Sequence, residues 1–234
     1  MVPSPQQFQP QTEYFDNNTS SKGQTVQAGE AYQNASLLVK GTVRPLFSTS
    51  QVYMSFLENG QQQDANYTDG EWVWSYSASQ SGQTAEIQLT AQTNQTSEDV
   101  SWALMLSTET PSGPDFDNYQ FMTGTTSHNA EEGTWNIFPY EPGSSPSPIV
   151  TYEWANQEGE SYQASYTISP PDETETFIIN YSKMEMEHSL SFRTQDGETE
   201  VVIAWNTDTG TGYINRAGED RVCWDENLET VPCQ

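Results

Sequence analysis

Carboxylate side chains are abundant in this chain, and some of them fall where a catalytic pair could form. Glu153, Glu185 and Glu187 lie on the predicted polar face of predicted β-strands. Two carboxylates can hydrolyse a glycosidic bond, one as a general acid and the other as a base or nucleophile. Because the chain holds 33 Asp and Glu residues, neighbouring carboxylates are also expected by chance. We therefore favour a protein that is not an enzyme, and keep a glycan hydrolase with paired carboxylates as an alternative.

Sequence motifs for other kinds of catalysis or for a cofactor do not occur in the chain. It contains no G-x-S-x-G nucleophile turn and no G-x-x-x-x-G-K phosphate loop. The run N-T-D-T-G at 206–210 is similar to the start of a calcium loop. Arg216 stands where that loop needs its glutamate, so we predict a hairpin turn instead. His188 is in phase with Met186 and Leu190, which predicts a core histidine with a hydrogen-bond partner. We expect no cofactor and no metal.

Aromatic side chains form the feature with the most promise for ligand binding. Seven of them fall on the apolar faces of predicted strands: Trp72, Trp74, Tyr76, Trp102, Tyr152, Trp154 and Tyr166. This aromatic stripe could line a cavity for an apolar ligand, offer stacking surfaces to sugars, or simply fill the core. Buried Trp and Tyr must satisfy their polar N–H and O–H groups, so a solid core of them is unusual. All three readings stay open.

The two cysteines, Cys223 and Cys233, are close enough in sequence to form a local disulfide. A metal site would need more ligands nearby, and the only histidines are His128 and His188. We expect the disulfide, which would place the protein in an oxidising compartment.

Apolar and polar residues alternate with a step of two from residue 71 onward, which is the pattern of half-buried β-strands. The clearest runs cover residues 71–107, 150–154, 162–168, 177–181, 184–192 and 201–205. Short links between these runs predict a mainly β protein. We expect an antiparallel up-and-down meander that forms one curved sheet or an open barrel. A closed up-and-down barrel is the main alternative.

The residues before the first strand predict one or two N-terminal helices that cover the sheet. A helix is expected over 28–40, ended by Gly41, and another from Pro45 to a stop at Gly60. Residues 1–27 carry few apolar side chains and are expected to be a flexible tether. The Pro-rich stretch 139–148 is predicted to be a long loop, so residues 28–234 are expected to form a single β-rich domain.

The charge balance excludes some partners. Seven Lys and Arg stand against 33 Asp and Glu, giving a formal net charge of −26. Such a surface repels nucleic acids and anionic membranes, which are bound through Lys and Arg. The acidity fits a surface adapted to high salt, a cation-binding protein, or ordinary drift in exported proteins. No apolar run reaches the roughly 18 residues needed to span a membrane.

Three parts of the chain carry a resemblance. The tail CWDENLETVPC, the segments EWVWSYSASQ, EIQLTAQ and DVSWALMLS, and the piece MTGTTSHNAEEGTWNIF resemble exported lipoproteins of Bacteroidetes-type bacteria. The resemblance covers residues 70–233 and implies a location in the periplasm or on the cell surface. The Pro- and Gln-rich opening, residues 1–14, is expected to be the tether that follows a cleaved export signal or a lipid-anchored Cys, so membrane attachment would be through a removed lipid anchor. A sheet covered by helices is also similar in outline to periplasmic lipoprotein carriers.

These observations lead to one main functional prediction and its alternatives. We expect a non-enzymatic protein of the cell envelope that binds an apolar or lipid-like ligand between sheet and helices. A surface module that binds carbohydrate or protein is the first alternative, and the glycan hydrolase is the second. The sequence does not indicate an oligomeric state.

Overall fold

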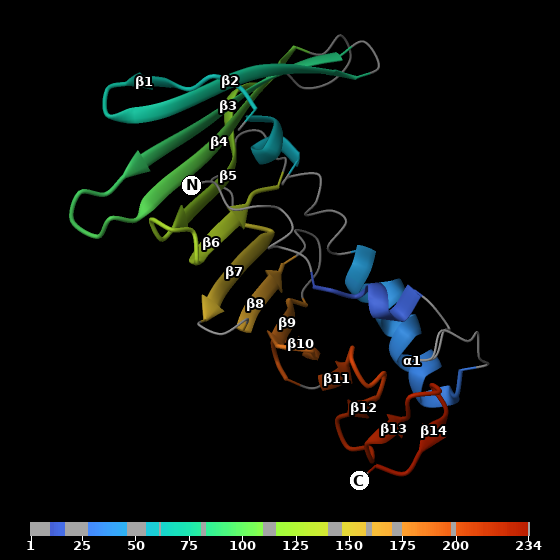
Figure 1. Ribbon diagram of the computed structural model, residues 1–234. Helices are drawn as coiled ribbons and strands as arrows, with labels where there is room; N and C mark the ends of the chain where they lie inside the picture. The colour runs from blue at the N-terminus through green and yellow to red at the C-terminus, as the bar shows by residue number, and fades with distance from the viewer. Residues whose placement is uncertain are drawn as a thin grey trace. The chain divides into compact units, whose positions relative to one another are not determined.

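The computed structural model describes residues 10–16, 28–45, 55–60, 62–80, 83–109, 116–139, 147–157, 161–169, 175–197 and 200–233. Its strands form one antiparallel sheet in which each strand lies beside its neighbours in the sequence, from β1 at one end to β14 at the other (Figure 1). The sheet does not close, because β1 and β14 are not paired. The up-and-down meander expected from the sequence is therefore confirmed, and the closed barrel is excluded.

The strands follow the alternation that predicted them. The first seven are β1 (Asn66–Thr68), β2 (Glu71–Gln80), β3 (Gln83–Thr93), β4 (Val100–Glu109), β5 (Phe116–Thr126), β6 (Glu132–Ile137) and β7 (Val150–Gln157). The others are β8 (Ser161–Ile168), β9 (Phe177–Met184), β10 (Glu187–Thr194), β11 (Glu200–Asn206), β12 (Gly212–Arg216), β13 (Val222–Trp224) and β14 (Thr230–Val231).

The chain divides into two compact units. The first unit holds residues 1–7, 51–155 and 167–173, and the second holds 8–50, 156–166 and 174–234. The single domain expected over 28–234 stays a prediction, and each unit is considered by itself below.

The first unit buries one face of its strands. The strand register aligns Leu89, Leu104, Met122 and Ile137 as successive cross-strand neighbours on this face, and all four are buried. A helical turn at residues 55–60 packs on the same face, with Leu57 fully buried. The Tyr76 hydroxyl donates a 2.6 Å hydrogen bond to the carbonyl oxygen of Phe56. The rest of the helix expected from Pro45 onward falls on residues 46–54, outside the described residues.

The second unit carries the helix α1 (Glu30–Leu38), which packs against β12, β13 and β14 (Figure 1). The prediction that Gly41 ends this helix is wrong. The helix continues through a π-helical segment η3 (Val39–Val43) as far as Pro45. A glycine inside a helix costs about 1 kcal/mol. Burial of Val39 and Val43, both fully inaccessible to solvent, offsets that cost.

The N-terminal segment, residues 10–16, also belongs to the second unit and differs from the flexible tether expected over 1–27. It contains the short 3-10 helix η2 (Glu13–Asp16), and Phe15 is fully buried. The average composition of residues 1–27 concealed the adjacent aromatic pair Tyr14 and Phe15, which supplies enough apolar surface to hold this short piece. Residues 1–9 and 17–27 lie outside the described residues. Within the described part of the chain, no helix has the length and apolarity needed to cross a membrane.

Candidate functional site

The aromatic stripe is distributed over both units. Trp72, Trp74, Tyr76, Trp102, Tyr152 and Trp154 belong to the first unit, and Tyr166 belongs to the second. Trp102, Tyr152, Trp154 and Tyr166 are buried, whereas Trp72 is 47% exposed. Trp74 stacks on Trp102 with ring centroids 6.1 Å apart, and Tyr152 stacks on Trp154 at 5.3 Å. These are contacts of core-filling side chains, and a ligand-binding role for the stripe stays a prediction.

Glycines on neighbouring strands make room for some of these rings. Gly124 pairs with Trp135 across β5 and β6, and Gly133 pairs with Trp154 across β6 and β7. A Cβ added at either glycine would collide with the facing indole ring. Each indole thus lies over a glycine backbone, which lets a bulky ring fill the inner face of the sheet. The second unit repeats the arrangement with Gly212 and Trp224.

The buried indoles of the stripe also find hydrogen-bond acceptors. Trp102 Nε1 donates to Thr126 Oγ1 at 3.0 Å, and Trp154 Nε1 donates to the carbonyl oxygen of Ala130 at 3.4 Å. Satisfied in this way, Trp can occupy a core without an energetic penalty for its N–H group.

Exposed aromatic surface occurs at the first edge of the sheet. Tyr67 on β1 is 62% exposed and lies opposite Trp72, with ring centroids 5.0 Å apart. The sequence pattern did not single out Tyr67, because β1 has only three residues and all of them are exposed.

The open face, meaning the side of each unit's strands opposite the buried aromatic rings, is populated mostly by small uncharged side chains. One row of cross-strand neighbours crosses six strands of the first unit: Val73, Thr90, Ala103, Thr123, Asn136 and Thr151. Thr151 Oγ1 donates to Asn136 Oδ1 at 3.0 Å. The row itself is uncharged, while Glu71, Glu86, Glu132 and Glu153 stand on the same face in the rows beside it.

The three carboxylates considered for catalysis are distributed over both units. Glu153 lies on the open face of the first unit, where its neighbour on β6 is Thr134. Glu187, in the second unit, has Met184 and Asn206 as its cross-strand neighbours. The expectation that Glu185 lies on a strand is wrong, because it occupies the turn between β9 and β10 with a φ of 55°.

The open face of the second unit is hollowed into a groove of about 390 Å³. The middle of the groove is formed by small side chains, which leave space above the sheet. They belong to the cross-strand neighbours Ser182, Ser189 and Ala204 on β9, β10 and β11. Tyr213 follows in the same row on β12. Around these four residues the groove is lined by Met184, Glu187, Asn206 and Thr211, and also by His188, Trp205 and Gly212.

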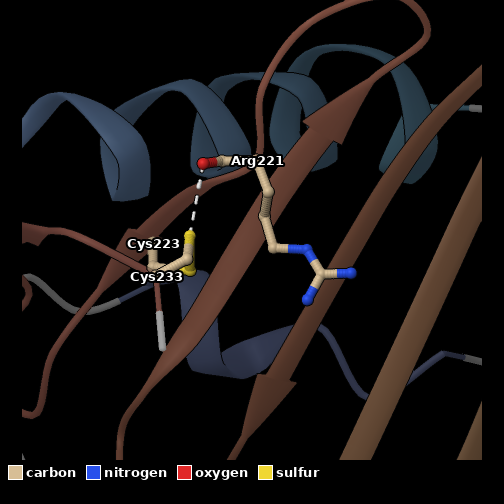
Figure 2. The surroundings of a disulfide bond; sticks show 3 residues. All are labelled: Arg221, Cys223 and Cys233. Atoms are coloured by element: carbon tan, nitrogen blue, oxygen red, sulfur yellow. Dashed lines mark hydrogen bonds between the residues drawn. A yellow bond between two sulfur atoms is a disulfide. The ribbon is translucent and has the colours of Figure 1, made fainter.

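Tyr213 is held in place by a chain of contacts that ends at the disulfide. The Arg221 guanidinium carbon lies 4.0 Å from the centroid of the Tyr213 ring, a cation–π contact. Cys223 and Cys233 are bonded, as the sequence predicted, and Cys233 Sγ lies 3.2 Å from the carbonyl oxygen of Arg221. In Figure 2 this carbonyl faces the disulfide while the Arg221 side chain extends away from it. The disulfide thereby fixes the backbone from which Arg221 reaches Tyr213.

His188 lies on the buried side of β10 and is a core histidine, as predicted. It is 3% exposed, stacks on Trp205 and accepts or donates a 2.8 Å hydrogen bond with Tyr181 through Nδ1. Burial, together with the nearby charge of Lys183, lowers the pKa of His188 to about 4. Burial also raises the pKa of Tyr181 to about 12, so its hydroxyl keeps its proton beside the neutral imidazole. His188 is therefore a neutral imidazole bonded to Tyr181 and stacked on Trp205.

Met186, expected on the apolar face beside His188, is 52% exposed, and Met184 at the end of β9 is 62% exposed. The strand ends at Met184, so the alternation that placed Met186 in the core does not continue through the turn. Among the described residues, no group of three or more metal-ligating side chains comes together.

Comparison of the chain with protein-family models, curated proteins and solved structures found no match. The functional argument therefore depends on the geometry alone.

Proposed function

We propose that the protein is a non-enzymatic binding module that takes a neutral carbohydrate in the groove of the second unit. The observation that carries the proposal is a row of small side chains ending at an aromatic ring, Ser182, Ser189, Ala204 and Tyr213. A sugar ring presents C–H groups on its faces and hydroxyls at its rim. The C–H groups can stack on the ring of Tyr213, and the hydroxyls can form hydrogen bonds with serine, threonine and asparagine side chains.

The volume and charge of the groove support the same ligand class. Its size of about 390 Å³ falls in the range of small-molecule sites, roughly 300–1,000 Å³. Glu187 is the one acid among the described residues that line it. With a net charge of −26, the molecule repels acidic glycans, so a neutral saccharide is the better ligand.

The other two functions expected from the sequence gain less support. A hydrolase needs two carboxylates at the scissile bond, and the groove supplies one, Glu187. An apolar ligand between helix and sheet would need space that, in the second unit, Phe15 and its aromatic neighbours occupy. We also keep the proposal of an exported protein of the cell envelope, because a disulfide persists in an oxidising compartment.

A glycan array probed with the full chain tests the proposal. We expect binding to neutral glycans that Tyr213→Ala abolishes and that Ser189→Trp also abolishes by filling the groove. Ser191→Trp is the matched control, since Ser191 lies on the same face of β10 but outside the groove lining. Binding to no neutral glycan, or binding that both groove substitutions leave unchanged, would contradict the proposal.

A further inference from the structure

The N-terminal segment fills a cleft of the second unit and makes its central contacts with aromatic rings. Phe15 is fully buried and contacts Trp205, Tyr32 and Trp224 at centroid distances of 5.0, 5.7 and 6.4 Å. Tyr32 belongs to α1, Trp205 to β11 and Trp224 to β13. The cleft wall is therefore shared between the helix and the sheet, with Phe15 as the anchor at its centre.

Hydrogen bonds around Phe15 fix the backbone of the segment. The Tyr14 hydroxyl donates to the carbonyl oxygen of Gly210 at 2.7 Å and accepts from Trp224 Nε1 at 2.9 Å. The Tyr32 hydroxyl donates to the carbonyl oxygen of Tyr14 at 3.1 Å. Ser36 Oγ donates to the carbonyl oxygen of Phe15 at 3.3 Å.

Arg44, near the end of the helix that begins with α1, holds the segment at two places. Its Nε donates to Thr12 Oγ1 at 3.1 Å, and its Nη2 donates to the carbonyl oxygen of Thr12 at 2.6 Å. Its Nη1 forms an ion pair with the carboxylate of Asp16. The hydrogen bond from Arg44 lowers the pKa of Asp16, so this carboxylate stays charged and paired.

These contacts have the layout of a peptide complex. A buried aromatic anchor sits in a pocket of other rings, and polar contacts, including an Arg–Asp pair, surround it. No strand of the sheet includes the segment, so the groups named above hold it in place of a β-ladder. The carbohydrate groove opens on the opposite face of β10 and β11, and Trp205 contributes to both the groove and the cleft.

We propose that the cleft between α1 and strands β11–β13 is a peptide-binding site whose ligand has the pattern Thr-x-Tyr-Phe-Asp. The chain's own N-terminal segment, with Thr12, Tyr14, Phe15 and Asp16, is its resident ligand. Recognition depends on the cleft and on the peptide side chains, not on the covalent link between them. The same peptide supplied separately therefore binds whenever the resident segment is weakened or cut from the chain.

The test uses the full chain with its resident segment weakened by Tyr14→Ala and Phe15→Ala. A fluorescently labelled peptide of residues 10–16 is titrated into this double variant and into the wild type, and its anisotropy is measured. We expect saturable binding to the double variant and at least roughly tenfold weaker binding to the wild type, whose cleft is already occupied. A peptide carrying Phe15→Ala is the control and should not bind.

A second measurement tests the proposal without the double variant, in case that variant does not fold. A protease site placed between residues 17 and 27 of the otherwise wild-type chain is cut, and the labelled peptide is added in excess. We expect the cut segment to stay bound and to exchange with the labelled peptide. If the labelled peptide binds saturably to neither protein, or if the Phe15→Ala peptide binds equally well, the cleft is not a peptide site and the segment is ordinary core.

Discussion

His188 shows how one buried side chain makes stability depend on pH. Its pKa of about 4 in the folded protein lies below the ordinary value of 6.5 because the imidazole is buried. The unfolded chain therefore binds more protons between these two pH values. We expect the contribution of His188 to the free energy of unfolding to be complete above pH 6.5. Below that it should fall by up to about 1.4 kcal/mol per pH unit until pH 4.

The variant His188→Gln isolates this contribution, because Gln keeps a hydrogen-bond acceptor for Tyr181 and does not titrate. Urea unfolding at several pH values from 7.5 to 4.5 gives the free energy of unfolding of both proteins. Their surface carboxylates are the same, so the difference between the proteins reports His188. Parallel pH profiles would show that the histidine is not held neutral by the fold.

The Cys223–Cys233 disulfide should contribute to stability and to the groove at once. We expect the double variant Cys223→Ser and Cys233→Ser to lower the free energy of unfolding by about 2–3 kcal/mol, mainly by freeing the unfolded chain. Because Cys233 contacts the backbone of Arg221, the same variant should also reduce any glycan binding through Tyr213. Chemical denaturation checks the first effect and the glycan array checks the second. An unchanged unfolding midpoint would contradict the structural role of the bond.

Individual residues were predictable where local pattern decides their environment. The phase of His188 on its strand placed it in the core, and the short spacing of the cysteines indicated their bond. Tyr213 was not singled out, because its importance arises from the small residues on three neighbouring strands and from Arg221. Those contacts depend on strand register, which one sequence does not reveal.

At the scale of elements, the glycine–tryptophan pairs explain how strands rich in indole rings can pack. Gly124→Ala should lower the free energy of unfolding by about 1–3 kcal/mol, because the added methyl group must displace the buried ring of Trp135. Gly41→Ala is the matched control, since nothing lies within 4 Å of the added Cβ and helices favour Ala over Gly by about 1 kcal/mol. Thermal unfolding of both variants measures the contrast. Equal stability of the two would contradict the packing role of Gly124.

Most elements could be read from the sequence, and the exceptions have physical reasons. A period of two survives in the strands because one of their faces is buried and the other is wet. Gly41 did not end the helix, since tertiary burial of Val39 and Val43 outweighed its low helix propensity. The N-terminal segment was missed because it holds its place through contacts with residues roughly 200 positions away, such as Trp224 and Gly210.

At the scale of the whole molecule, several acidic residues of the described part lie at turns and strand ends, while Glu86 and Glu153 stand within strands on the open face of the first unit. Asp69, Glu98, Glu131, Glu185 and Asp208 are all exposed and lie outside or at the ends of strands. Exposed carboxylates at these positions repel one another through water. An adaptation of this acidic surface to high salt stays a hypothesis.

The net charge predicts how the protein responds to salt. Even if each of the seven Lys and Arg paired with one acid, 26 of the 33 acids would have no cationic partner (33 − 7). Two of the described pairs are Arg44–Asp16 and Arg216–Glu219. Repulsion among the remaining carboxylates is strongest in the compact state, so it favours unfolding. Salt shortens the range of this repulsion, because the Debye length falls from about 10 Å at 0.1 M to about 3 Å at 1 M.

We therefore expect molar NaCl to raise the unfolding temperature, and KCl to raise it by about the same amount, since screening depends on ionic strength and not on the identity of the cation. A specific calcium site would behave differently, saturating at low millimolar calcium while sodium had little effect. Thermal unfolding in NaCl, KCl and CaCl₂ series distinguishes general screening from a calcium site.

A variant in which exposed acids such as Glu131 and Asp208 are replaced by Gln and Asn should be more stable at low salt and gain less from added NaCl. If the unfolding temperature stays flat or falls between low and molar NaCl, carboxylate repulsion is not the destabilising term that the charge balance implies.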